Sequence, residues 1–176
     1  MRPSPTKLAK KGKPADPKLR VRPGTAGDVL AILKLVRGLA EYEHLTRHLR
    51  PSASRLRRDG FGRCRYFESL ICTRAGDAVG YAIFYFAYST FTCSPVLFVE
   101  DIFVLPEERG RGAGKAIMAA LARIAVNRGC HQMEWIVLDW NKPSIEFYRK
   151  LGARLDKTWV LTRLTDARLR RLAGRG

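Results

Sequence analysis

The chain has 176 residues, with 33 Lys or Arg against 16 Asp or Glu, which gives a net charge of +17 and a pI near 10.4. This length suits one domain, and a hydrophobic fraction of 46% is sufficient for a buried core. No apolar run reaches the roughly 20 residues that span a bilayer, so we expect no membrane partner. The four cysteines form no C-x-x-C pair. We therefore expect reduced thiols, no bound metal and a cytoplasmic location.

The excess positive charge is concentrated at the two ends of the chain. Residues 1–20 carry seven basic and one acidic side chain, and residues 154–176 carry seven basic and two acidic ones. This distribution does not favour a nucleic-acid-binding face, apart from contacts made by the ends. Residues 1–18 are expected to form a basic flexible tail, which solvation, organelle targeting or nucleic-acid contact would each explain. A domain over 19–165 and a basic C-terminal segment over 166–176 complete the organisation.

Hydrophobic periodicity predicts an alternation of strands and helices. Thr25 and Asp28 form a pattern close to a capping box, directly before apolar residues at helical spacing. Alternating or continuous apolar segments predict strands over 19–22, 66–73, 78–88, 96–104, 132–138 and 157–163. Apolar residues at helical spacing predict helices over 29–44, 53–59, 116–126, 143–151 and 165–173. This order predicts an α+β fold around one largely antiparallel sheet.

A glycine-rich segment from Arg109 to Lys115 follows a predicted strand and opens a predicted helix. Its glycines let the backbone approach a ligand closely, and the unpaired N–H groups of the helix favour an anion. The segment lacks the first glycine and the Ser or Thr of a P-loop, and it lacks the last glycine of a dinucleotide-binding motif. What fits is R-x-x-G-x-G at Arg109, Gly112 and Gly114, which resembles the pyrophosphate loop of the GNAT acyltransferases.

Further segments resemble the GNAT superfamily and, within it, the diamine (spermidine/spermine-type) and thialysine acetyltransferases. Similar motifs follow in the family's order at 22–28, 39–43, 84–91, 99–104, 109–115 and 138–152. The resemblance implies the GNAT acyl-CoA N-acyltransferase fold, a mixed and mostly antiparallel sheet, flanked by helices, whose central strands splay apart. It implies acetyl-CoA as co-substrate, a primary amine of a small diamine, polyamine or lysine-like acceptor, and direct attack in a ternary complex. It also implies a homodimer.

The same resemblance gives roles to individual residues. Glu100 is the expected catalytic base and Tyr148 the expected general acid, which protonates the departing CoA thiolate. Tyr42, Glu43, Glu100 and Asp101 are expected to bind the acceptor amine. Because side chains alternate along a strand, Glu100 and Asp101 are expected on opposite faces of the sheet. The residues expected to bind CoA are Ile102, Phe103, Val104, Arg109, Gly110, Arg111, Gly112, Ala113, Gly114, Lys115, Asn141 and Ser144.

One departure from the family bears on the acceptor. Ser89 stands where polyamine-acetylating members carry an additional acid, which favours the thialysine-type branch over long polyamines. Two alternatives stay open: a protein or peptide N-acetyltransferase, and a basic, nucleic-acid-associated GNAT-fold protein without turnover. The second is opposed by the aromatic residues of 84–91, which are not interleaved with Arg or Lys as stacking platforms would be.

Overall fold

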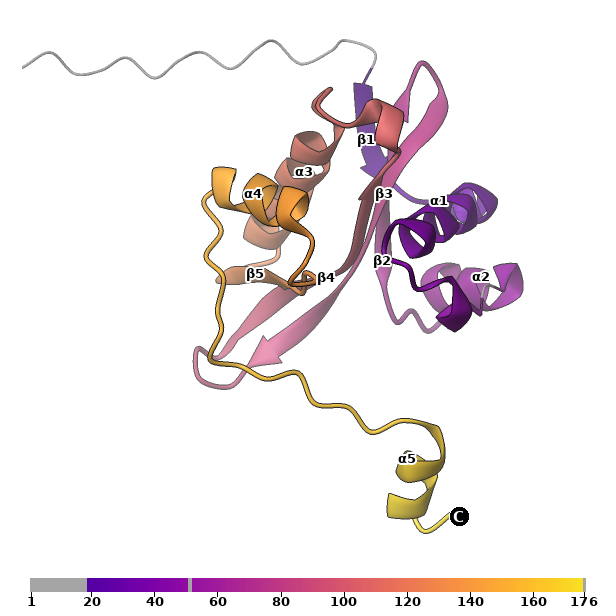
Figure 1. Ribbon diagram of the computed structural model, residues 1–176, viewed down its shortest axis with the longest axis vertical. Helices are drawn as coiled ribbons and strands as arrows, with labels where there is room; N and C mark the ends of the chain where they lie inside the picture. Colours follow the sequence, from indigo (N-terminus) through magenta and orange to yellow (C-terminus); the bar gives the residue numbers. More distant parts are fainter. Residues whose placement is uncertain (1–18, 51, 176) are drawn as a thin grey trace, which may run out of the picture. The chain divides into compact units, whose positions relative to one another are not determined.

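The fold is built on one mixed sheet that carries helices on both faces (Figure 1). The computed structural model describes residues 19–50 and 52–175. The chain divides into two units, Met1–Ile136 and Val137–Gly176. The tail predicted over 1–18 lies outside the described residues.

The first unit holds the sheet, whose strand order among the described residues is β1-β2-β3-β4-β5. Neighbouring strands are antiparallel, apart from β4 and β5, which are parallel. This arrangement confirms the predicted mixed, mostly antiparallel sheet. The strands are β1 (Leu19–Pro23), β2 (Glu68–Arg74), β3 (Asp77–Ser89), β4 (Ser94–Val104) and β5 (Gln132–Trp135).

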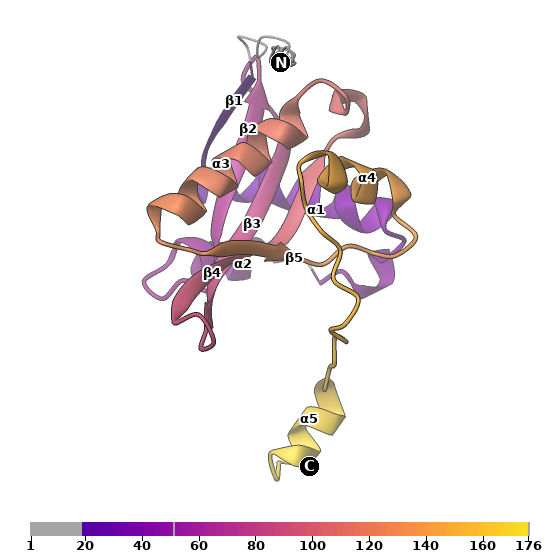
Figure 2. The same ribbon diagram turned by 90° about the vertical axis from the view of Figure 1, so that its left-hand side faces the viewer.

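The helices of the first unit cover opposite faces of this sheet. Figures 1 and 2 show α1 (Val29–Tyr42) and α2 (Ala53–Phe61) on one face and α3 (Ala113–Asn127) on the other. The segment predicted as a short helix over 53–59 is a helix of nine residues. No helix in the described part of the chain is long and apolar enough to cross a bilayer.

The main core lies between α1 and the sheet. Ile32 and Leu35 of α1 pack against Ile71, Tyr81 and Phe103, and each of these side chains is at most 4% exposed. The helix approaches the sheet closely at Gly38, where an added Cβ would lie 2.9 Å from the Phe103 ring. Truncating a buried leucine to alanine in such a core costs about 2–5 kcal/mol.

The second unit contains α4 (Lys142–Lys150) and α5 (Asp166–Leu172), joined by an irregular segment. The strand predicted over 157–163 is wrong, because no described strand pairs with these residues. Trp159 and Val160 are 81% and 82% exposed. Residues of this type favour a half-buried position in a pleated sheet. They form a strand only where a neighbouring strand is available for hydrogen bonding.

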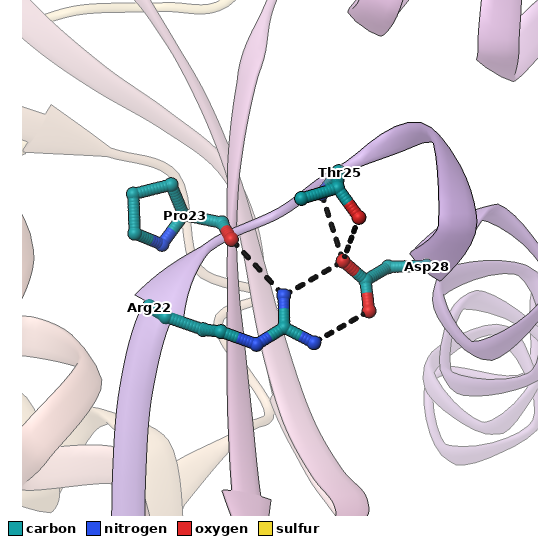
Figure 3. A network of polar contacts seen from close by, with 4 residues as sticks. All are labelled: Arg22, Pro23, Thr25 and Asp28. Carbon is teal, nitrogen blue, oxygen red and sulfur yellow. Dashed lines mark hydrogen bonds and ion pairs between the residues drawn. The ribbon is translucent and has the colours of Figure 1, made fainter.

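The link between β1 and α1 is fixed by a small polar network (Figure 3). Arg22 donates to both carboxylate oxygens of Asp28, at 2.8 Å each, and also to the Pro23 carbonyl at 3.1 Å. Asp28 Oδ2 also accepts from the Thr25 N–H and hydroxyl, which confirms the predicted capping box. The Arg22 hydrogen bonds, reinforced by those of Thr25, hold the pKa of Asp28 well below its ordinary value.

We predict that Asp28→Asn lowers the free energy of unfolding by about 1 kcal/mol at pH 7. Because the folded-state pKa is depressed, the stabilisation is complete above the unfolded pKa of about 4 and is progressively lost as the pH falls from there through the lower folded-state pKa. Urea unfolding at pH 7 and pH 3 tests this, with the exposed Asp139→Asn as control. If Asp28→Asn lowered the free energy of unfolding by the same amount at both pH values, the prediction would be contradicted.

Candidate active site

A β-bulge in β4 determines where the two adjacent carboxylates of the site point. Ile83 of β3 pairs with Asp101, but the next β3 residue, Phe84, pairs with Val99, so Glu100 is the extra residue. An extra residue interrupts the alternation of side chains. Asp101 therefore shares the α1 face with Glu100, whose charge acts on it. The expectation that the two acids lie on opposite faces is wrong, because it assumed an unbroken strand.

Asp101 is the more buried of the two acids and has a specific donor. The Tyr81 hydroxyl donates to Asp101 Oδ2 at 3.2 Å. Burial, followed by the negative charge of Glu100, raises the pKa of Asp101 to about 6, against the lowering effect of the Tyr81 hydrogen bond. Burial and the charge of Asp101 raise the pKa of Tyr81, so its hydroxyl keeps its proton. Asp101 thus changes charge close to neutral pH.

A third carboxylate reaches this face from the end of α1. Glu43 is the C-cap residue of that helix, and its charge contributes to the raised pKa of Asp101. Burial also raises the pKa of Glu43 itself. The structure thus brings together Glu43, Glu100 and Asp101, three of the four residues predicted to bind an amine. The fourth, Tyr42, precedes Glu43 directly.

Beyond the bulge, the outer edge of β4 has no ladder partner among the described strands. The parallel ladder between β4 and β5 ends at the pair Val99 and Trp135, so Ile102–Val104 have no partner in β5 (Figure 2). The strand predicted over 132–138 is accordingly shorter, and its ladder to β4 ends at Val99, directly before the bulge residue Glu100. An open edge of this kind can accept an extended ligand through its backbone groups.

The glycine-rich loop after β4 leads into α3. Gly110 and Gly112 have φ of +73° and +91°, and Gly112 is the N-cap residue of the helix. An L side chain rarely adopts such a backbone conformation, so the loop needs glycine at both positions. The N–H groups of the first turn of α3 are free of intrahelical partners and suit an anion. Ala113 is buried beneath this turn, and Lys115 is exposed on it.

The two arginines of the loop are engaged by the protein. The Arg111 guanidinium contacts Glu108 Oε1 at 2.7 Å. The Arg109 guanidinium lies over the rings of Tyr42 at 4.3 Å and Phe103 at 5.6 Å, and its Nε donates to the Val104 carbonyl at 3.2 Å. Both arginines therefore help to position the loop. Their expected contribution of positive charge toward a bound anion stays a prediction.

A buried ion pair that sequence reasoning missed anchors this loop to β2. Arg74 Nε lies 2.6 Å from Glu108 Oε2, and the two side chains are only 8% and 12% exposed. Arg74 also donates to the Arg111 carbonyl at 3.1 Å. Tyr81 was missed as well. The only sequence signal for Arg74 is weak: a charged residue at the end of an otherwise apolar strand. Nothing in the sequence indicates that Arg74 pairs with Glu108 or Tyr81 with Asp101, because each acid lies far along the chain.

The remaining predicted residues belong to the second unit. Asn141 caps α4, and its side-chain oxygen accepts from the Ser144 N–H at 3.3 Å, as the sequence indicated. Tyr148 lies on the buried side of α4, with its ring 5.3 Å from that of Phe147. Their proposed functional roles stay predictions.

Comparison with known proteins places this arrangement in a family. The model of the acetyltransferase (GNAT) family matches residues 33–153. A thialysine N-epsilon-acetyltransferase of Mus musculus is 38% identical over 168 residues, which cover 89% of this chain and 98% of that protein. The chain belongs to the GNAT acetyltransferase family.

One further relative supports the family, and one solved structure supports the fold. The spermidine/spermine N(1)-acetyltransferase-like protein 1 of Homo sapiens is 34% identical over 141 residues, which cover 76% of this chain and 20% of that protein. The solved structure of an integron cassette protein from V. cholerae has a TM-score of 0.75 at 21% identity and covers 89% of this chain and 98% of its own. That structural likeness confirms the predicted fold.

We predict that Glu108→Gln lowers the free energy of unfolding of this acetyltransferase by about 3 kcal/mol. The change leaves the buried Arg74 without its carboxylate, and removing one partner of a buried ion pair is strongly destabilising. Denaturant unfolding measures the loss, and Glu107→Gln, at the exposed neighbouring position, is the matched control. Equal stabilities of the two variants would show that the ion pair contributes nothing.

Proposed function

We propose that this acetyltransferase transfers the acetyl group of acetyl-CoA to the side-chain amine of a lysine-like amino acid of the thialysine type. The observation that carries the proposal is the gathering of Glu43, Glu100 and Asp101 on one face of the sheet, beside an open strand edge. Three carboxylates attract a cationic acceptor, and at least one must also take its proton. An alkylamine has a pKa of roughly 10.4, so only about one molecule in 2,500 is neutral at pH 7.

The residues around the open edge of β4 fit a CoA thioester. The backbone of Ile102–Val104 would hold an extended arm, and the loop from Gly110 to Gly114 with the start of α3 would hold the phosphates. Lys115 is exposed at the same turn and adds positive charge. Acetyl-CoA supplies an activated acetyl group as a thioester.

The chain's own residues would manage the protons of the transfer. The acceptor ammonium loses two protons as its nitrogen forms the amide bond and the carbon–sulfur bond of the thioester breaks. A carboxylate of the acidic face takes the first proton and releases it to solvent. The departing sulfur takes up one proton, and we assign its delivery to Tyr148, which the family resemblance identifies as the general acid. The second proton of the nitrogen restores the Tyr148 hydroxyl, so one proton is released to solvent in each turnover.

Two features favour an amino-acid acceptor over a long polyamine. Ser89, at the end of β3, is uncharged where polyamine-acetylating members carry an acid, so it offers no anion to a further ammonium group. The thialysine acetyltransferase also matches this chain over more residues and at higher identity than the spermidine/spermine-like protein does. A small diamine is the second candidate.

The homodimer expected from the resemblance stays a prediction, which light scattering would test.

CoA thiol release from acetyl-CoA tests the proposed function. The acceptors are thialysine, lysine, putrescine, spermidine, spermine and a lysine-containing peptide, compared by kcat/KM at pH 8. We expect the highest kcat/KM for thialysine or lysine. A preference for putrescine or spermidine would replace the acceptor with a diamine, and activity on the peptide alone would make the chain a protein acetyltransferase. Absence of turnover with every amine would overturn the proposal.

We predict that Tyr148→Phe lowers kcat about 100-fold, as loss of a general acid does, with little change in acetyl-CoA affinity. Steady-state kinetics and calorimetric titration with acetyl-CoA measure the two effects. Tyr66→Phe, which changes a tyrosine that is 76% exposed, is the control and should leave both unchanged. Parallel losses of kcat and affinity in Tyr148→Phe would instead indicate a structural role.

A further inference from the structure

Tyr81 is a buried polar residue for which the family resemblance provides no role. It lies in the middle of β3, is 0% exposed and belongs to the core between the sheet and α1. Phe103 is its direct partner on β4, so Asp101 lies diagonally across from it, two residues along the strand. At this diagonal position the long phenol reaches the carboxylate, and the hydrogen bond measures 3.2 Å.

The surroundings of Asp101 would otherwise favour its neutral form. Glu100 contributes a negative charge from β4, and Glu43 contributes another from the end of α1. A charge of opposite sign on this face is that of Arg109, whose guanidinium lies over the Tyr42 and Phe103 rings. Burial acts in the same direction as the two acids. The Tyr81 hydroxyl, from β3, opposes all three effects, because a donated hydrogen bond stabilises the carboxylate.

We propose that Tyr81 is a positioning residue that keeps the Asp101 carboxylate ionised and oriented toward the acceptor amine at neutral pH. The inference rests on the proposed function and deepens it, since it makes Asp101 the half-buried carboxylate that receives the first proton of the acceptor. Tyr81 gives up no proton itself, because burial and the Asp101 charge stabilise its neutral form. Glu100, which is exposed, then has the task of attracting the cation.

Tyr81→Phe is the direct test, because it removes one oxygen and leaves the ring in the core. Without the donor the pKa of Asp101 rises further, and the acid limb of kcat/KM against pH moves upward by about one unit. Activity at pH 5.5 then falls roughly tenfold, whereas activity at pH 9 approaches that of the unchanged protein. Tyr66→Phe is the matched control and should reproduce the original pH profile. An acid limb of Tyr81→Phe that stays in place overturns the inference.

Asp101→Asn tests the same step without relying on the stability of the Tyr81 variant. It removes the group that titrates, so the acid limb near pH 6 should disappear along with most of the activity. Adding Tyr81→Phe to Asp101→Asn should produce no further change in the pH profile. Persistence of the original acid limb in Asp101→Asn, or additive effects of the two changes, would contradict a role of Tyr81 through Asp101.

A titration that needs no turnover separates this inference from the proposed function. Carbon-13 NMR of aspartate carboxyl groups follows the pKa of Asp101, and the resonance is assigned by its loss in Asp101→Asn. We expect a higher pKa in Tyr81→Phe than in the unchanged protein, even if none of the tested amines proves to be a substrate. Equal pKa values overturn the role of Tyr81, even if thialysine is acetylated rapidly.

Discussion

The single extra residue in β4 is the constraint on which the rest of the site depends. Because Glu100 has no partner in β3, the side chains that follow are displaced relative to those that precede it. The same irregularity coincides with the end of the ladder to β5, whose last pair joins Val99 and Trp135. One local irregularity thus adjoins both features on which the proposed site depends, the acidic face and the edge of β4 that has no partner in β5.

Two carboxylates of this protein, the buried Glu108 and the half-buried Asp101, have different partners, and the difference matches the structural role of Glu108 and the role proposed for Asp101. Glu108 contacts the guanidinium groups of Arg74 and Arg111, so its charge is compensated and it serves to hold the loop. Asp101 receives a neutral hydroxyl from Tyr81 and lies near two further acids. Asp101, a carboxylate among like charges, can therefore exchange its proton near neutral pH.

The sign of the local charge at the site opposes that of the whole chain. A net charge of +17 repels a cationic acceptor at long range, but salt screens this repulsion beyond about 10 Å at 0.1 M. Inside that distance the carboxylates of Glu43, Glu100 and Asp101 dominate. Two cations of the glycine-rich loop are meanwhile engaged by the protein, since Arg109 lies over aromatic rings and Arg111 contacts Glu108.

The sequence by itself determined the family, the local signals and the order of the elements, apart from the strand expected over 157–163. The glycines of 110–114, the capping residues Thr25 and Asn141, and the apolar periodicity of the strands act within a few neighbours along the chain, so their pattern can be read directly. Only the tertiary structure decided the faces of Glu100 and Asp101, the end of β5 and the pairing of Tyr81 with Asp101. These depend on strand register, and a shift of one residue reverses the face of every side chain that follows. The apolar residues near Trp159 give the converse case, since a strand-like pattern forms no strand where no ladder partner is present.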